Sequence, residues 1–387
     1  MGDFVPIDLE AVPGAFAASI DATIGIEEEF QILDLGSLDL APRFEELRAA
    51  ADATDPVLAA SLAGELISSE IEIRSGRGEN FADALARQRE HRTRLFGLVV
   101  ANGAALGSTG THPWADYREQ PNIDTEHYRG VVEGLQYVAR RNNTFSLHVH
   151  VGIRDIDRAV QVCDRLRGVL PVLLALSASS PYLDGLDSGL HSARSQAFTK
   201  SFPRCGIPDA YGSWAAYRDY LDLLIATNSI REYTQVWWSV RPHFAFGTVE
   251  VRICDAQPSA GESDALAALM AACVLQCARD IDEGVPAVQR PRRLLEENLW
   301  RAIRHGMDGR MIDFDARAEQ PVAAAVERLL AWTEPVRAEH GLDVVLPDRN
   351  GAQRQRALIA EGVPMREVFA ETVRETRETY AANVSAR

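Results

Sequence analysis

Lysine is almost absent from this 387-residue sequence. Lys200 is the only lysine among the 40 basic residues, and all the others are arginines. The phosphate-binding pattern GxxxxGK[ST] and the dinucleotide pattern GxGxxG are also missing. A nucleotide bound by this protein would therefore have to be held by metal ions and arginines rather than by a glycine-rich loop.

Cysteine is scarce as well. The five cysteines are scattered and none forms a CxxC pair, which argues against a zinc site and against a disulfide framework. The sequence has no apolar run of transmembrane length, and its first 22 residues lack the basic segment of a signal peptide. We therefore expect a cytoplasmic protein with reduced thiols and no membrane partner.

Acidic residues outnumber basic residues by 56 to 40, which gives a formal net charge of −16. Nucleic acids and anionic membranes bind basic surfaces, so this balance argues against both as partners. With 46% hydrophobic residues, the chain can bury a large core. We expect one catalytic domain over residues 1–387, with a leader at 1–21 and a mostly helical C-terminal part at 292–387.

Helical patterns alternate with short strand patterns along the chain. Asp55 followed by Pro56 is typical of a helix start, and Ser259 with Glu262 three residues later matches a capping box. Pro171 should break or kink its helix. Helices are predicted over residues 56–63, 80–106, 127–141, 156–180, 214–227, 259–281, 294–305, 321–340 and 353–382.

The most informative stretch lies near the start, where residues 23–33 read TIGIEEEFQIL. Because side chains alternate between the two faces of a strand, Glu27 and Glu29 share one face, and the other is apolar except at Glu28. Two carboxylates in this arrangement lie roughly 7 Å apart. If half-buried, they need raised pKa values or a cation such as Mg²⁺ or Mn²⁺. Taken alone, the stretch is explained more simply by a solvated strand face.

The same layout recurs in three later stretches. SEIEIRS at residues 69–75, LHVHVG at 147–152 and TVEVRICD at 248–255 each alternate apolar residues with charged or imidazole side chains. Such half-apolar strands are expected in an antiparallel sheet with one packed face. A solvated face normally carries Thr, Lys, Ser or Gln, whereas these faces carry Glu, His and Arg almost exclusively. Four such strands side by side would form a wall able to hold metal ions and phosphate together.

Together these stretches resemble the type-2 glutamate–cysteine ligase family of carboxylate–amine ligases, whose fold is similar to that of glutamine synthetase. Three connecting blocks resemble the family as well: GTHPWADYREQP (110–121), SASSPYLDGLDSGLHSARSQAF (177–198) and ENLWRAIRHG (297–306). The resemblance implies an α+β fold in which helices flank a curved, mostly antiparallel β-sheet. A homodimer is compatible with it.

The resemblance also implies a set of metal ligands. Mg²⁺ (or Mn²⁺) around the phosphates of ATP would be bound by residues from all four strands, namely Glu27, Glu29, Glu72, His148 and Glu250. Glu65 and Glu70 are alternatives to Glu72. His150 is expected beside the nucleotide, although His148 and His150 could exchange these roles.

Arginines complete the implied site. Arg252 matches an arginine that contacts the transferred phosphoryl group, and Arg74 is a second catalytic candidate by position. Arg194 and Arg241 are candidate clamps for a phosphate or a carboxylate group, and are expected among the residues that bind the ATP cofactor. For Arg74, Arg194 and Arg241, a surface ion pair is the alternative explanation.

The implied activity is ATP-dependent formation of an amide from L-glutamate and an amine, L-cysteine, through a gamma-glutamyl acyl-phosphate. Metal ions and arginines suit this reaction, because a carboxylate and a triphosphate must approach each other. Two alternatives remain open: a phosphoryl transferase of the guanidino-kinase type and a non-catalytic nucleotide-binding regulatory module. The second would be expected to lack some of the four polar strand faces, and all four are present.

Overall fold

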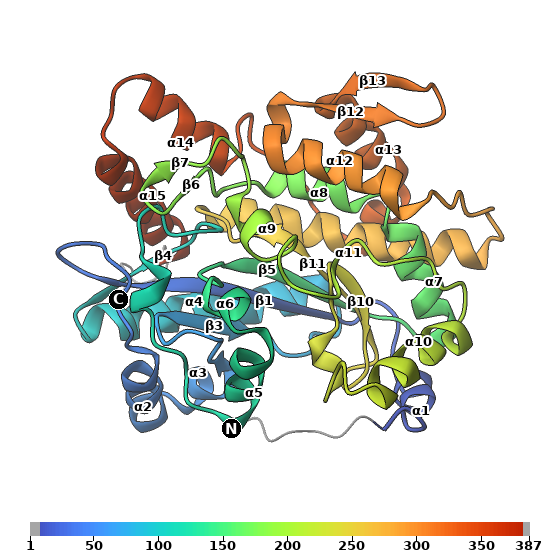
Figure 1. The fold of residues 1–387 in the computed structure, drawn as a ribbon, viewed down its shortest axis with the longest axis horizontal. Helices are drawn as coiled ribbons and strands as arrows, with labels where there is room; N and C mark the ends of the chain where they lie inside the picture. Colours follow the sequence, from blue (N-terminus) through green and yellow to red (C-terminus); the bar gives the residue numbers. More distant parts are fainter. Residues whose placement is uncertain (1–7, 382–387) are drawn as a thin grey trace.

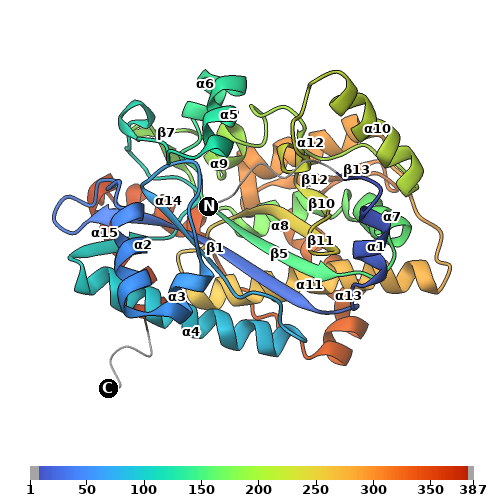
Figure 2. The same cartoon turned by 90° about the horizontal axis from the view of Figure 1, so that it is seen from below.

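The computed structural model describes residues 8–381, which are built around a seven-stranded sheet (Figure 1). All strand pairs in this sheet are antiparallel, in the order β10-β11-β5-β1-β3-β2, and β4 pairs with the far end of β1. The strands are β1 (Ile24–Asp34), β2 (Leu62–Ala63), β3 (Glu70–Arg74), β4 (Ala104–Gly107), β5 (Ser146–Gly152), β10 (Val240–His243) and β11 (Thr248–Asp255). The four stretches of alternating polarity are thus neighbouring strands, and Figure 2 shows β1, β5 and β11 side by side.

The apolar face of the sheet forms the core. Val149 on β5 and Val251 on β11 are completely buried, as the alternating pattern predicts. Helices from both halves of the chain cover this face: α4 (Phe81–Ala101), α7 (Ile156–Leu166), α8 (Leu170–Ser177) and α11 (Ala260–Asp282). The opposite, polar face is therefore left to form a site.

Glu28 is the carboxylate that lies on the apolar face of β1, and its hydrogen bonds explain its position there. Both Glu28 oxygens accept hydrogen bonds from the buried guanidinium of Arg92 on α4, at 2.7 and 2.8 Å. Ser263 on α11 donates a further hydrogen bond to Glu28. Arg92 also pairs with Asp264 at 2.7 Å, and the exposed Arg89 pairs with Asp264 as well, so two arginines offset the two carboxylates. This polar contact fastens β1 to two of its covering helices.

Several of the predicted helices are divided or shortened. The helix predicted over 127–141 is divided at Gln136 (φ 49°), and the one predicted over 56–63 ends at Ser61, where β2 begins. The predicted helix 80–106 ends at Ala101, because Gly103 takes a left-handed conformation (φ 68°) and the following apolar residues pair with β1 as β4. The helix predicted over 156–180 is two helices, with Pro171 in the first turn of the second. The segment 353–382 is likewise divided, at Gly362 (φ 89°).

The capping box predicted at Ser259 is wrong. Ser259 makes no side-chain capping bond at the start of α11. Glu262 instead accepts hydrogen bonds from Arg354 of α14 (Gly351–Ala360), at 2.5 and 2.8 Å. A tertiary ion pair has replaced the local cap.

The leader predicted at residues 1–21 is partly integrated into the fold. Helix α1 (Val12–Ala17) contacts α7, and Phe16 is completely buried. Residues 1–7 of this leader lie outside the described range.

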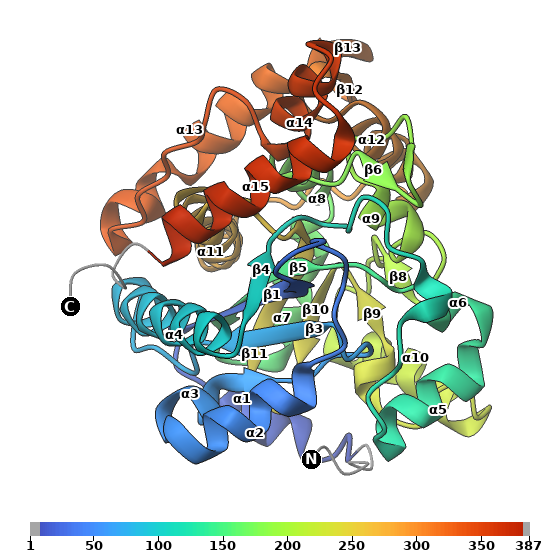
Figure 3. The same cartoon turned by 90° about the vertical axis from the view of Figure 1, so that its left-hand side faces the viewer.

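The remaining helices surround the sheet. They are α2 (Phe44–Thr54), α3 (Pro56–Ser61), α5 (Glu126–Leu135), α6 (Tyr137–Arg140), α9 (Ala193–Ala197), α10 (Trp214–Ala226), α12 (Arg292–His305), α13 (Val322–His340), α14 (Gly351–Ala360) and α15 (Met365–Tyr380). Figure 3 shows α13, α14 and α15 at the opposite end of the molecule from α2 and α3. The C-terminal part contacts the sheet's own helices, since α12 packs on α8 and α13 on α11. Within residues 8–381, no helix combines the length and apolarity needed to cross a membrane.

Candidate active site

The register of the sheet places the polar side chains opposite one another. Glu27 lies across from His148 on one side and from Arg74 on the other. Glu29 faces Glu72, and Glu250 lies between His150 and Arg241. These side chains line a cavity of about 420 Å³ on the polar face of the sheet. Cross-strand neighbours on one face are close enough to share a ligand.

One group of metal-type ligands consists of Glu27, His148 and Glu250. Each offers a ligand atom, and these atoms lie within 4.8 Å of one another. Glu27 Oε2 is 3.3 Å from His148 Nδ1. Burial and the neighbouring Arg252 lower the pKa of His148, so its imidazole stays neutral, which is the form that coordinates a metal.

A second group consists of Glu29, Glu72 and His148, again with ligand atoms within 4.8 Å. His148 belongs to both groups and lies between them. Ser146, which sequence reasoning did not single out, donates its hydroxyl to Glu29 at 2.7 Å and contacts His148 Nε2 at 2.8 Å. Ser146 therefore orients both Glu29 and His148 within this second group.

The alternatives to Glu72 also line the cavity. Glu70 is buried next to Glu29 on the same polar face, whereas Glu65 lies on the loop before β3 and is half-buried. Burial and neighbouring carboxylates raise the pKa values of all three, that of Glu65 to about 7. Carboxyl groups are therefore crowded at this end of the cavity, and a bound cation would favour their ionised form.

Two arginines clamp Glu250. Arg241 Nε donates to Glu250 Oε2 at 2.7 Å, and Arg252 donates to Oε1 at 2.6 Å. Their charges hold the pKa of Glu250 well below its usual range, although burial opposes this. Arg241 also donates to the carbonyl oxygens of Thr234 and Val236, so it is fixed in place by the backbone.

The other predicted residues differ in how they face the cavity. Arg74 pairs with Glu72, lies 3.6 Å from Glu27, and is 45% exposed at the edge of the site. His150 Nδ1 is hydrogen-bonded to the Thr248 hydroxyl. The buried Nε2 of His150 has no hydrogen-bond partner among the described residues. That nitrogen lies 3.5 Å from Glu27 and 4.0 Å from Glu250.

Arg194 lines the same cavity but its guanidinium is engaged with the protein. It donates to the carbonyl oxygens of Ile253 and Arg252 and lies 3.6 Å from the buried carboxylate of Asp255. These contacts hold the backbone of β11 behind Arg252. They give Arg194 a structural task that the sequence pattern did not indicate.

Aromatic residues at the rim were missed by sequence reasoning. Phe246, in the turn between β10 and β11, is 57% exposed, stacks on His243 and meets His150 edge-on. His127 and Glu232 form an ion pair on the far side of the cavity, which raises the pKa of His127. No local pattern marks these positions: Phe246 and Glu232 lie in loops, His127 lies in the first turn of α5, and only tertiary contacts bring the three to the site.

The chain belongs to glutamate–cysteine ligase family 2, because the sequence model of that family matches residues 23–376. The resemblance seen in the sequence is thereby confirmed. The protein named "Putative glutamate--cysteine ligase 2" of Solibacter usitatus is 37% identical over 361 residues, covering 92% of this chain and 93% of the relative. "Putative glutamate--cysteine ligase 2-2" of Rubrobacter xylanophilus is 37% identical over 372 residues, covering 94% and 93%.

Solved structures confirm the predicted fold class. Glutamate–cysteine ligase from Francisella tularensis, solved in complex with AMP, superimposes with a TM-score of 0.70 at 12% identity, covering 95% of this chain and 90% of that one. A bifunctional glutathione synthetase from Pasteurella multocida gives a TM-score of 0.67 at 14% identity, covering 96% and 54%. At these identities the comparison concerns the fold alone.

Proposed function

We propose that this protein is an ATP-dependent carboxylate–amine ligase that activates L-glutamate and joins it to an amine, L-cysteine, in the cytoplasm. The observation that carries the proposal is the pair of carboxylate–imidazole groups that share His148 beside Arg252. Membership of glutamate–cysteine ligase family 2 supports the choice of acid and amine.

The donor set fits Mg²⁺ or Mn²⁺. Carboxylate oxygens with a single imidazole suit these hard ions better than thiolate-binding metals. The buried Nε2 of His150, which has no hydrogen-bond partner within residues 8–381, and the raised pKa values at Glu65, Glu70 and Glu72 both favour an added positive charge. Glu27, His148 and Glu250 would hold one ion, and Glu29, Glu72 and His148 a second. When bound, such ions neutralise phosphate oxygens and lower the cost of bringing two anions together.

A neighbouring cavity suits the base of the nucleotide. This cavity of about 350 Å³ shares Glu27, Arg74, His150 and Phe246 with the site. The rest of its lining is mostly small or apolar, and Gly25 leaves the space beside His150 open. A purine could lie against Phe246 there, with its phosphates directed toward Glu27.

The chain's own residues can then be given roles in the reaction. Arg252 is held by Glu250 and can stabilise the charge that spreads over the phosphoryl group during its transfer to the carboxylate of glutamate. Arg74 lies at the exposed edge and can neutralise the incoming anion. Arg241 and Arg194 keep Glu250 and the backbone of Arg252 in place. The amine then attacks the acyl-phosphate carbonyl, and phosphate leaves.

Hydroxylamine trapping tests this proposal. With ATP, Mg²⁺, glutamate and hydroxylamine but no cysteine, the protein should release ADP and phosphate and form gamma-glutamyl hydroxamate. A guanidino-type kinase would give a phosphorylated guanidine and no hydroxamate, and a regulatory module would release no ADP. If hydroxamate forms with another carboxylic acid but not with glutamate, the ligase mechanism stands and that acid replaces glutamate as the proposed substrate. Its absence across a broad panel of acids, with folded and metal-loaded protein, would refute the ligase.

A further inference from the structure

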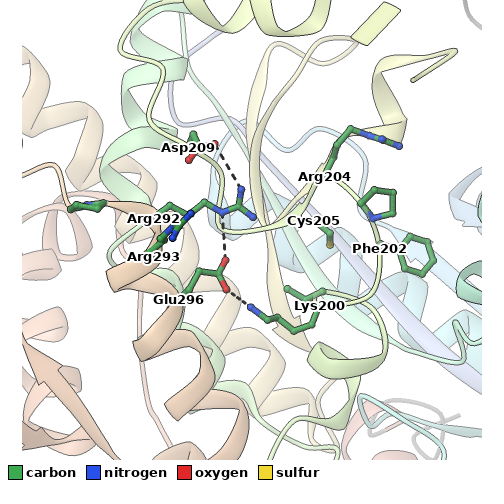
Figure 4. A pocket seen from close by; sticks show the side chains of 11 residues that line it. Lys200, Phe202, Arg204, Cys205, Asp209, Arg292, Arg293 and Glu296 are labelled. Carbon is green, nitrogen blue, oxygen red and sulfur yellow. Dashed lines mark hydrogen bonds and ion pairs between the residues drawn. The ribbon is translucent and has the colours of Figure 1, made fainter. Parts of the chain in front are cut away.

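A larger cavity, of about 840 Å³, lies next to the candidate active site and shares Phe202 with it. Its walls come from α12 and from the loop around residues 199–209 (Figure 4). The charged residues that line it are Lys200, Arg204, Asp209, Arg292, Arg293 and Glu296. Four are cationic and two are anionic, so the lining carries a net charge of +2 (4 − 2). This is the opposite sign to the −16 of the whole chain.

The arginines of this cavity have few partners of their own. Arg292 lies 3.8 Å from Asp209 and 3.6 Å from Glu296, which is too far for direct hydrogen bonds, and it is stacked 5.0 Å from the ring centre of Trp238. The guanidinium of Arg293 makes no hydrogen bond or ion pair with any residue in the range 8–381, although its backbone belongs to α12. The dashed lines in Figure 4 show the loose contacts of Arg292 and the closer pair of Lys200 with Glu296.

Arg204 is similar. Its side chain donates one hydrogen bond, from Nε to the carbonyl oxygen of Gln235, and the guanidinium lies 5.7 Å from the ring centre of Trp237. A guanidinium has five N–H donors. Three arginines therefore line one cavity with a single side-chain hydrogen bond among them to the described protein. Arginines in the active site are, in contrast, all bound to carboxylates or carbonyl oxygens.

We propose that this cavity is a binding site for a small polyanion, a molecule with two or more phosphate or carboxylate groups, separate from the active site. Forked guanidinium donors held on aromatic rings match such groups in geometry and charge. The buried walls contributed by Phe202 and Cys205 reduce the screening of these charges by water. Phosphorylated and polycarboxylate ligands share this chemistry, and the experiment below distinguishes them.

The location of the cavity makes the bound anion an effector. Trp237 and Trp238, against which Arg204 and Arg292 lie, form β9, and β9 pairs in parallel with β8 (Cys205–Gly206). The next residue, Ser239, donates its N–H to Gly206 and accepts the backbone N–H of Arg252 at 2.8 Å. An anion bound at Arg292 or Arg204, each of which lies over a tryptophan of β9, therefore acts on the strand that supports Arg252, and on Phe202 in the shared wall.

Binding is measured by calorimetry on the full-length protein in metal-free buffer, without ATP, so that the result does not depend on the proposed ligase activity. The probes are inorganic pyrophosphate and propane-1,2,3-tricarboxylate. We expect saturable binding of one equivalent of probe. In the double variant Arg292→Gln/Arg293→Gln the dissociation constant should rise at least about tenfold for each arginine removed, or about 100-fold in total. The control, Arg301→Gln/Arg328→Gln, removes the same charge from arginines that do not line this cavity and should bind as the unmodified protein does. The stronger of the two probes identifies the ligand class.

Equal weakening in both variants, or no saturable binding up to about 10 mM, would overturn the proposed site. The effector role is tested with excess Mg²⁺ in the turnover assay. The stronger probe should change kcat or KM of the unmodified protein and leave the Arg292→Gln/Arg293→Gln variant unaffected. Binding without any change in kcat or KM would overturn the effector role. A protein that binds the probe but shows no ligase activity would leave the site standing and refute only the proposed function.

Discussion

Glu27 and His148 lie directly opposite each other in the antiparallel pair of β1 and β5, and Glu27 Oε2 lies 3.3 Å from His148 Nδ1. The two residues are 121 positions apart in the sequence. The β5–β11 register sets His150 against Glu250, and the β1–β3 register sets Glu29 against Glu72. A single sheet face thus gathers the side chains from which a ligase site can be built.

Loss of one carboxylate from the proposed metal groups should abolish most activity. Glu27→Gln, Glu29→Gln and Glu250→Gln each remove a charge from a shared ligand set, so we expect turnover to fall at least about 100-fold. The fold, followed by circular dichroism, should be retained. ATP-dependent ADP release measures the effect, and the exposed Glu133→Gln serves as control. Near-normal activity in Glu29→Gln would remove Glu29 from the site.

Arg252 should act on the transition state more than on bound ATP. Arg252→Lys keeps the charge but loses the planar fork that contacts Glu250 and, by our proposal, the moving phosphoryl group. We expect kcat to fall far more than the affinity for nucleotide, measured by steady-state kinetics and by ATP titration. Equal losses in both would make Arg252 a binding residue only.

Phe246 should contribute to nucleotide binding. It is exposed at the boundary between the active site and the neighbouring 350 Å³ cavity. Phe246→Ala removes a stacking surface worth about 1 kcal/mol, so the KM for ATP should rise about fivefold while kcat changes little. Phe246→Trp should restore the affinity. If Phe246→Ala leaves the KM for ATP unchanged, the base binds elsewhere.

Arg92 should stabilise the fold through its buried pair with Glu28. Arg92→Met leaves Glu28 and Asp264 without this partner, and breaking such a buried pair costs about 3–5 kcal/mol of unfolding free energy. The control is Arg89→Met, since Arg89 lies on the same helix and pairs with Asp264 but is exposed. The control should lose less than about 1 kcal/mol. Urea denaturation measures both, and similar losses would contradict the assignment.

His112 should make stability depend on pH. Its Nδ1 accepts backbone N–H groups of Trp114 and Ala115, and its Nε2 donates to the carbonyl oxygen of Leu38, so the folded protein requires a neutral ring. Burial lowers its pKa from 6.5 to about 4. Between these two values the unfolded chain binds a proton that the folded protein does not. The free energy of unfolding should therefore fall as the pH is lowered from about 6.5 to about 4.

His112→Gln removes this titration. The measurement is the difference in unfolding free energy between the unmodified protein and His112→Gln at several pH values. We expect that difference to shrink toward low pH, even though other histidines titrate in both proteins. A difference that stays constant with pH would show that His112 does not titrate as proposed.

Local patterns in the sequence predicted most of the sheet. Alternation with a period of two depends only on neighbouring residues, so Val149 and Val251 could be assigned to the core face and Glu27 and His148 to the other. Helix ends were less predictable. β4 continues the apolar pattern of α4, and only its pairing with β1 reveals it as a strand.

The sequence by itself determined which residue types lie on the polar face, and therefore the class of chemistry. Tertiary structure decided how these side chains are grouped into the two sets of metal-type ligands. Strand register, which depends on contacts between distant segments, sets Glu72 rather than Glu70 opposite Glu29 and puts His148 in both metal-type groups. Tertiary contacts also decided that the guanidinium of Arg194 donates hydrogen bonds to the backbone of β11. Glu28 looked like a misfit in the strand pattern, and it was explained only when α4 supplied Arg92, because a buried charge needs a partner that no local pattern specifies.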